Sequence, residues 1–166
     1  MLPVSIIVPA WNEEKALPAT FRALGDVAYD REKSELIVVA GGKDKTYEVA
    51  QDLAGLKKPF SRNIVIPQQA RGTKNAAIQQ GIREARNPVI VLLDADTIVS
   101  PRWLTQLVDP IERGECDLAI ANSEPIRRNW VSDYFIIIKT SFAEEITTYP
   151  GHSLAVSYTH LTLPTN

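Results

Sequence analysis

The sequence has one cysteine in 166 residues, and this scarcity excludes two kinds of site. Cys116 has no partner for an internal disulfide, and a single thiol cannot form a cysteine cage around zinc. Aromatic residues are also sparse at 7%, whereas hydrophobic residues make up 45% and charged residues 23%. This composition is typical of a soluble globular protein, and the length suits one domain with its own core.

A small net charge and the lack of a long hydrophobic run limit the possible partners. The formal charge of −2 gives no overall attraction for nucleic acid, so we expect no nucleic-acid partner. The apolar stretch YFIIIKTSF is interrupted by Lys139 and is too short to span a membrane. Met1 leads at once into a strand-like run, without a signal peptide. We therefore expect the chain to be cytoplasmic, or to act at the cytoplasmic face of a membrane.

Apolar runs and helical spacings alternate along the chain. Runs rich in β-branched residues predict strands over 4–10, 34–42, 62–67, 88–93 and 116–122. Helical spacings predict helices that begin near Leu17, at Thr46 as N-cap, within 71–85, and at Ser100 as N-cap before Pro101, with another over 130–146. This alternation predicts the α/β class, with a doubly wound, mostly parallel sheet and helices on both faces, incomplete at its C-terminal end.

Residues 156–166 depart from this pattern, because they carry no charge, no helical face and no clean alternation. The run VSYTHLTLPT back-translates into a sequence that matches a transposase adapter used to prepare DNA sequencing libraries. We therefore expect residues 1–155 to form the domain and residues 156–166 to be a non-native tail. The alternative is a genuine threonine-rich strand.

The run PVIVLLDADT ends an apolar strand with two carboxylates one residue apart. Burying a carboxylate is costly unless it is paired or bound to metal, and doubly wound sheets bind ligands at the carboxyl ends of their strands. Asp94 and Asp96 are therefore expected at the ligand edge, on the same side if the chain stays extended there. Carboxylates are the hard oxygen ligands that Mg²⁺ and Mn²⁺ take. The alternative is that both aspartates only form a turn or cap a helix.

Four segments, in this order, resemble family-two glycosyltransferases: VSIIVPAWNEEKALPATFRAL, ELIVVAGGKDKT, GTKNAAIQQGI and VLLDADT. The resemblance covers about residues 3 to 155. It implies the glycosyltransferase A fold, which is a Rossmann-like fold of nucleotide-diphospho-sugar transferases, and assigns residues 1–155 to its N-terminal, nucleotide-sugar-binding part. It also implies a nucleotide-sugar donor, Mg²⁺ or Mn²⁺, and a glycan, lipid or small-molecule acceptor. A membrane association through sequence C-terminal to this chain stays open.

Carried over by position, the resemblance implies roles for residues in each segment. Those assigned to nucleotide-sugar binding are Pro9, Ala10, Asn12, Glu13, Ala40, Gly41, Lys74 and Asp94. The implied metal ligands are Asp94 and Asp96, and Lys74 would approach the ribose or the diphosphate. One position departs from the family, because Ala40 stands where an acidic residue usually reads the base. Either Asp44 compensates, or the donor carries a base other than uracil.

The resemblance gives no general base for the reaction. An inverting transfer needs a group that takes a proton from the acceptor hydroxyl, and in this family an acidic residue well after the two aspartates does so. Glu144 and Glu145 come too early to match, and TTYPGHSLAVS resembles the acceptor loop that precedes the base. The catalytic residue is therefore unknown, and we expect this chain to be inactive alone.

Three other functions remain as alternatives. LLDADTIV resembles the signature of aspartyl-phosphate phosphatases, but that signature normally ends the first strand, and here three strand–helix units precede it. VVAGGKDKT resembles the glycine-rich loop of nucleotidyltransferases, which also belongs on the first strand and carries an arginine that is missing here. The third alternative is a nucleotide-binding module without catalysis.

Overall fold

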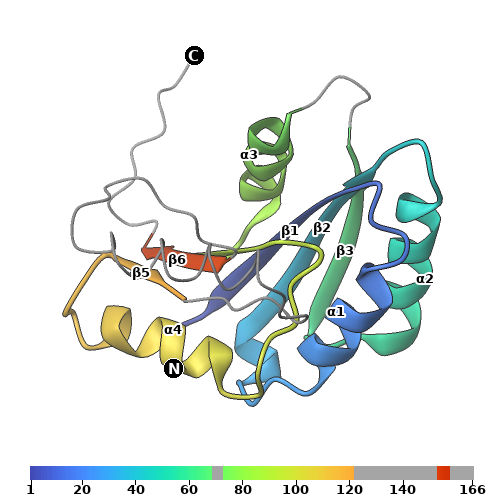
Figure 1. Cartoon of the computed structure of the whole chain (residues 1–166). Coiled ribbons are helices and arrows are strands. Elements are labelled where there is room, and N and C mark those ends of the chain that lie inside the picture. The colour runs from blue at the N-terminus through green and yellow to red at the C-terminus, as the bar shows by residue number, and fades with distance from the viewer. Residues whose placement is uncertain (69–72, 122–152, 158–166) are drawn as a thin grey trace, which may run out of the picture.

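The structure is a computed structural model that describes residues 1–68, 73–121 and 153–157. The strands are β1 (Val4–Trp11), β2 (Ser34–Gly41), β3 (Arg62–Pro67), β4 (Val89–Leu93), β5 (Leu118–Ile120) and β6 (Ser153–Ser157). The helices are α1 (Leu17–Gly25), the 3₁₀ helix η1 (Arg31–Lys33), α2 (Thr46–Lys57), α3 (Lys74–Glu84) and α4 (Trp103–Glu112). The strands form one sheet in the order β3-β2-β1-β4-β6-β5 (Figure 1).

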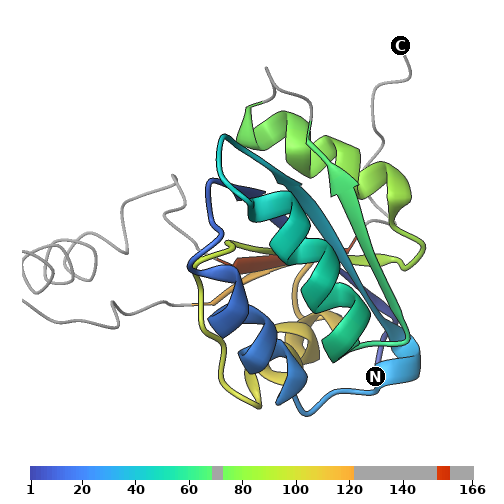
Figure 2. The ribbon, with the colours of Figure 1, turned by 90° about the vertical axis from the view of Figure 1, so that its right-hand side faces the viewer.

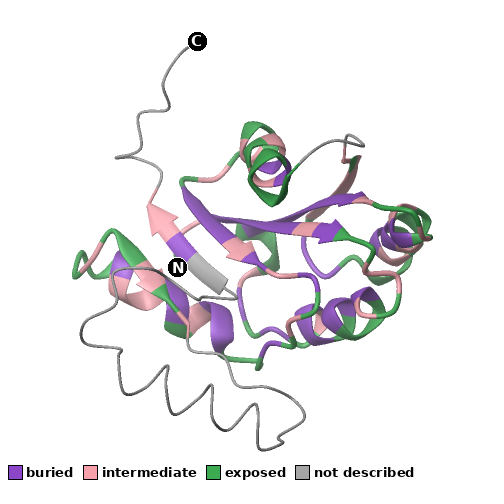
Figure 3. Ribbon diagram, turned by 45° about the horizontal axis from the view of Figure 1, so that its top comes forward, coloured by how far each residue is buried: buried purple, intermediate pink, exposed green. Residues whose placement is uncertain are grey.

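Helices cover both faces of the sheet, as the sequence predicts. β1 pairs in parallel with β2 and β4, and β2 pairs in parallel with β3. Because β1, β2 and β4 are covered on both faces, these three strands are buried along most of their length (Figure 3). One core lies between the sheet and α1, α2 and α4, and a smaller one lies under α3 (Figures 1 and 2). The predicted doubly wound α/β class is confirmed.

Helix α3 lies very close to the sheet. Its buried residues are Ala77 and Gly81, and it packs over β1 and β2. A Cβ atom built on Gly81 would lie 2.5 Å from Cγ2 of Ile7 and 3.4 Å from Cγ2 of Val39. A glycine at residue 81 therefore allows a helix–strand approach that a larger residue would not.

Strand β6 is a feature that the sequence did not predict. It lies between β4 and β5 and pairs antiparallel with both, so that Leu93 faces Ser153 and Ile120 faces Leu154. Residues 153–157 had been expected to belong to an acceptor loop. They form a strand because β4 and β5 each offer them a backbone edge for hydrogen bonding. Pairing with such distant strands cannot be recognised from the residues of the segment itself. The expected boundary at residue 155 falls inside β6 and stays a prediction.

Several predicted boundaries differ from the structure. Thr46 is the first residue of α2 and not its N-cap. α4 begins at Trp103, because residues 100–103 form a preceding turn in which the Trp103 N–H donates to the Ser100 carbonyl at 3.0 Å. β5 is shorter than the predicted 116–122, and Trp11 belongs to β1 rather than to the following loop. The predicted helix over 130–146 lies outside the described residues.

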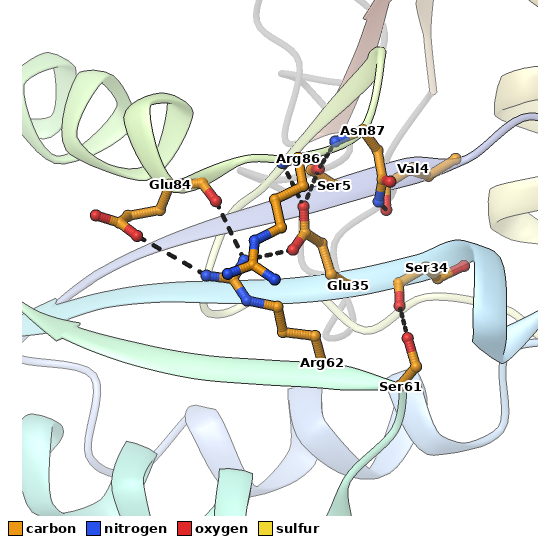
Figure 4. Close-up of polar contacts among 9 residues, drawn as sticks. All are labelled: Val4, Ser5, Ser34, Glu35, Ser61, Arg62, Glu84, Arg86 and Asn87. Atoms are coloured by element: carbon orange, nitrogen blue, oxygen red, sulfur yellow. Dashed lines mark hydrogen bonds and ion pairs between the residues drawn. The ribbon is translucent and has the colours of Figure 1, made fainter.

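A polar network holds the amino ends of the strands together (Figure 4). Glu35 of β2 is 3% exposed and accepts hydrogen bonds from the Ser5 hydroxyl at 2.5 Å and from the Arg86 N–H at 2.7 Å. It also forms an ion pair with Arg62 of β3, whose guanidinium donates to the Glu84 carbonyl at 3.1 Å. This network joins three strands to the end of α3, at the sheet edge opposite the predicted ligand edge.

Candidate functional site

The predicted site residues gather at the carboxyl edge of the parallel strands. β1, β2 and β4 end at this edge, and α3 begins there. Ala10 and Ala40 are buried in the core, so their side chains face away from solvent. Pro9, Glu13, Gly41 and Asp94 are half-buried, whereas Asn12, Lys74 and Asp96 are exposed. The edge therefore offers polar side chains from three loops and from one helix start.

The loop after β1 is locked to the loop after β2 through Asn12. Asn12 has a φ of 59°, and its N–H donates to the Gly41 carbonyl at 3.1 Å. Its side-chain Oδ1 accepts from the Lys43 N–H at 2.7 Å. Gly42 has a φ of +138°, and a Cβ there would lie 2.4 Å from that same Oδ1. The Asn12 side chain thus shapes the edge through the backbone of residues 41–43.

Asp44 and Thr46 form a second lock between these loops. The Thr46 hydroxyl donates to Oδ1 of Asp44 at 2.5 Å and accepts from the Glu13 N–H at 2.7 Å. Oδ2 of Asp44 accepts from the Glu14 N–H at 3.2 Å. Desolvation raises the pKa of Asp44, but the hydrogen bonds from Thr46 and Glu14 outweigh it and hold this pKa below its ordinary value. Both carboxylate oxygens of Asp44 are therefore used inside the loops.

The two aspartates of the Asp-Ala-Asp run sit on a tight turn. The Thr97 N–H donates to the Asp94 carbonyl at 3.1 Å, which closes a β-turn over residues 94–97. The condition that the chain stays extended at these residues is therefore not met, because β4 ends at Leu93. Ala95 is 4% exposed and points into the main core, which leaves Asp94 and Asp96 on the outer side.

Negative charge converges on Glu13, which follows β1. Burial raises the pKa of Glu13, and the charges of Asp96, Asp44 and Asp94 raise it further. Lys74, the first residue of α3, places its ammonium 2.5 Å from Oδ1 of Asp94. In the described ranges no three acidic, His or Cys residues lie together as a ready-made metal cage. Among the described residues, this edge thus presents carboxylates whose charges interact, with the ammonium of Lys74 next to Asp94.

Trp11 and Gly41, the last residues of β1 and β2, are uncharged. The ring of Trp11, which is 38% exposed, lies against Gly41. The Ala40 carbonyl accepts from the Gln68 N–H at 2.7 Å. Ala40 itself offers only a methyl group, and both oxygens of Asp44 are engaged. The geometry therefore gives no support to Asp44 as a replacement reader of the base.

Two threonines complete the site, and neither was predicted as a functional residue. The Thr46 hydroxyl accepts from the Glu13 N–H, 33 positions away in the sequence. The Thr20 hydroxyl of α1 donates to the Ala95 carbonyl at 2.6 Å, 75 positions away. A threonine in a helix pattern carries no local mark of such a contact. Only the folded arrangement identifies these hydroxyls.

The sheet order and the match to solved structures described below show a nucleotide-diphospho-sugar transferase fold of the glycosyltransferase A class. The model of the family described as glycosyl transferase family 2 matches residues 5–160, and the chain belongs to this family. The resemblance seen in the sequence is thereby confirmed. The phosphatase and nucleotidyltransferase alternatives lose their support.

Two curated relatives match part of the chain. The chain is 35% identical over 100 residues to a dolichyl-phosphate β-glucosyltransferase of Trichomonas vaginalis, which covers 56% of this chain and 30% of that protein. It is 29% identical over 121 residues to a dolichol-phosphate mannosyltransferase of Pyrococcus furiosus, which covers 73% of this chain and 33% of the relative. The chain thus spans about a third of the length of these relatives.

Solved structures show the same fold. The mannosyltransferase PcManGT of Pyrobaculum calidifontis, in complex with GDP-Man and Mn²⁺, superposes with a TM-score of 0.76 at 18% identity. That match covers 94% of this chain and 44% of the other. The glucosyl-3-phosphoglycerate synthase of Mycobacterium tuberculosis, in complex with Mn²⁺, UDP and glucosyl-3-phosphoglycerate, gives a TM-score of 0.65 at 19% identity. That match covers 95% of this chain and 57% of the other.

Proposed function

We propose that this chain is the donor-binding part of a glycosyltransferase that transfers a sugar from a nucleoside diphosphate to an acceptor. The observation that carries the proposal is the convergence of Asp94 and Asp96 with Glu13 and Lys74 at the carboxyl edge. A sugar nucleotide has a neutral nucleoside and a doubly charged diphosphate. The uncharged surface of Trp11 and Gly41 suits the nucleoside. The diphosphate would be attracted by Lys74 and by a cation held on the carboxylates.

The residues present fit a divalent cation. Asp94 and Asp96 offer carboxylate oxygens from one turn, and the Lys74 ammonium beside Asp94 is consistent with a positive charge at this position. Two carboxylates are too few for a hard cation that takes about six oxygen ligands, so the diphosphate and water would have to supply the others. Bound there, Mg²⁺ or Mn²⁺ would supply Lewis-acid stabilisation of the leaving diphosphate. Mn²⁺ in two structural neighbours supports this choice.

The chain's own residues prepare the site for the donor. The Asn12 and Thr46 hydrogen bonds hold the first two loops together, so that little loop ordering is left for binding. The Lys74 ammonium lies where it can move from Asp94 to a phosphate oxygen. Among the described residues none is assigned as the general base.

The acceptor that we propose is a lipid phosphate. The relatives named above are dolichyl-phosphate and dolichol-phosphate transferases, and another is an undecaprenyl-phosphate transferase. Such an acceptor places the reaction at a membrane surface, on the cytoplasmic side. No helix in the described part of this chain is long and apolar enough to cross a bilayer.

The proposal is tested by calorimetry of the 166-residue chain with UDP and GDP, each with manganese and with a chelator. At least one nucleotide should bind about thirty- to a hundred-and-fifty-fold more tightly with manganese, which corresponds to about 2–3 kcal/mol. Equal affinity with and without metal for both nucleotides would refute the proposal. An assay of the full-length protein with a sugar nucleotide and a polyprenyl phosphate distinguishes an enzyme from a non-catalytic module. The module would bind the sugar nucleotide but release no nucleoside diphosphate.

A further inference from the structure

A buried hydroxyl meets a backbone carbonyl directly behind the two aspartates. Thr20 is 1% exposed, and its hydroxyl donates to the Ala95 carbonyl at 2.6 Å. The other acceptor within reach, the Ala16 carbonyl one helical turn earlier, is 3.5 Å away. Hydroxyls of helical threonines commonly bond back to their own helix. The shorter bond to a different element makes Thr20 a cross-link between α1 and the turn over residues 94–97.

The carbonyl that Thr20 holds decides the conformation of this turn. Ala95 and Asp96 are its two central residues, and turns of types I and II differ by a rotation of the peptide that joins them. Type II requires a positive φ at the second central residue, which here is Asp96. Among the described non-glycine residues, positive φ occurs at Asn12 and Lys58. The peptide between residues 95 and 96 is thus held in one orientation, with its carbonyl toward α1.

We propose that Thr20 is a positioning residue for the metal-holding turn. Its hydroxyl fixes the plane of the 95–96 peptide, and this plane sets the direction in which the Asp96 carboxylate leaves the turn relative to Asp94. Without the hydroxyl, the Ala95 carbonyl loses its buried donor, and other turn conformations become competitive. The inference rests on the proposed function, since that function gives Asp96 its metal. Thr20 itself touches neither donor nor metal.

The test compares Thr20→Val, which replaces the hydroxyl with a methyl, and Thr20→Ser, which keeps the hydroxyl. Calorimetry uses UDP and GDP with manganese and with a chelator. Thr20→Val should lose about tenfold in manganese-dependent affinity, as expected for one buried hydrogen bond, and keep its affinity in chelator. Thr20→Ser should stay within about threefold of wild type in both conditions. Full manganese-dependent affinity in Thr20→Val would overturn the inference.

Ser34→Ala is the matched control. Ser34 is 2% exposed and donates its hydroxyl to the Asp30 carbonyl at 2.8 Å, at the opposite edge of the sheet. Its loss should lower thermal stability but leave the manganese dependence unchanged. If Thr20→Val does not fold, Thr20→Ala and Thr20→Ser give the same comparison, because both lack the methyl group and only Thr20→Ser keeps the hydroxyl.

Amide hydrogen exchange separates failure of this inference from failure of the proposed function. The Thr97 N–H closes the turn, so its exchange should be about tenfold faster in Thr20→Ala than in Thr20→Ser. Equal exchange in the two variants would refute the positioning role whatever the nucleotides do. Faster exchange in Thr20→Ala, in a protein without any manganese-dependent binding, would keep Thr20 as the residue that holds the turn and refute the metal role of Asp96.

Discussion

The ammonium of Lys74 lies 2.5 Å from a carboxylate oxygen of Asp94, although one residue begins α3 and the other follows β4. The Lys74 side chain is 59% exposed, and ion pairs so open to water contribute little to stability. The arrangement of Lys74 and Asp94 matters more for the binding of metal and nucleotide. Lys74 occupies the neighbourhood of Asp94 that a divalent cation would take, and it would be attracted to the diphosphate that arrives with that cation.

Lys74→Met should change two affinities in opposite directions. Binding of manganese alone should tighten by about threefold, since a competing cation near Asp94 is gone, and binding of UDP or GDP in chelator should weaken by about tenfold. Calorimetry measures both. Lys57→Met, at the far end of α2, is the control and should change neither. A simple solvated lysine at residue 74 predicts no change in either affinity, and that result would contradict the competition.

Asp96→Asn should weaken nucleotide binding only when metal is present. If the metal bridge contributes about 2–3 kcal/mol, the loss is about thirty- to a hundred-and-fifty-fold, with metal-free binding nearly unchanged. Folding should be unaffected or slightly favoured, because the charge of Asp96 is one of those that raise the pKa of Glu13.

Calorimetry and a thermal melt check both parts of the Asp96 prediction, with exposed Asp52→Asn as control. A phosphatase would instead show covalent phosphorylation of Asp94 by a phosphate ester. Mass spectrometry of the chain after incubation with such an ester would detect that product.

Gly42→Ala should destabilise the protein by about 1–3 kcal/mol. The φ of +138° is strained for any side chain, and the new Cβ would collide with Asn12 Oδ1 at 2.4 Å. Gly55→Ala is the matched control, because nothing lies within 4 Å of its Cβ position inside α2, and it should stabilise by about 0.5–1 kcal/mol. Urea unfolding of both variants measures the difference. Equal effects would show that the Asn12 loop does not need this glycine.

Acid should lower the free energy of unfolding of the protein through protonation of Glu35. Burial raises the pKa of Glu35, but hydrogen bonds from Ser5, Arg86 and Arg62 outweigh it and hold the folded-state pKa below its ordinary value. A lowered carboxyl pKa stabilises the fold above the ordinary value of 4.5, and this contribution is lost as the pH falls through and below 4.5 toward the folded-state pKa.

Glu35→Gln should therefore be less stable than wild type by roughly 3 kcal/mol at pH 7, and the gap should narrow in acid. Urea unfolding between pH 7 and pH 3 follows the gap. Exposed Glu48→Gln is the control and should cost about 0.5 kcal/mol at pH 7. A gap of constant size across this pH range would show that the Glu35 network does not titrate with folding.

The parallel part of the fold was predictable because its signals are local. Apolar runs mark the strands β1 to β4, and Pro18 admits a helix only from about Leu17. β6 was missed because its identity depends on pairing with β4 and β5, which are distant in sequence. In the candidate site, too, local features were predictable and contacts between distant residues were not. Its loops were predicted from strand ends, whereas the contacts of Thr20 and Thr46 and the turn at Asp94 depend on partners that a linear pattern does not reveal.

Gly81 has a consequence for how far the site can be tuned. It lies seven residues after Lys74, about two helical turns along α3, on the part of the helix pressed against Ile7. A methyl group at residue 81 would push this part of α3 away from β1 and would also shift the start of the helix, where Lys74 lies. The reach of the Lys74 ammonium toward Asp94 thus depends on a residue that has no side chain.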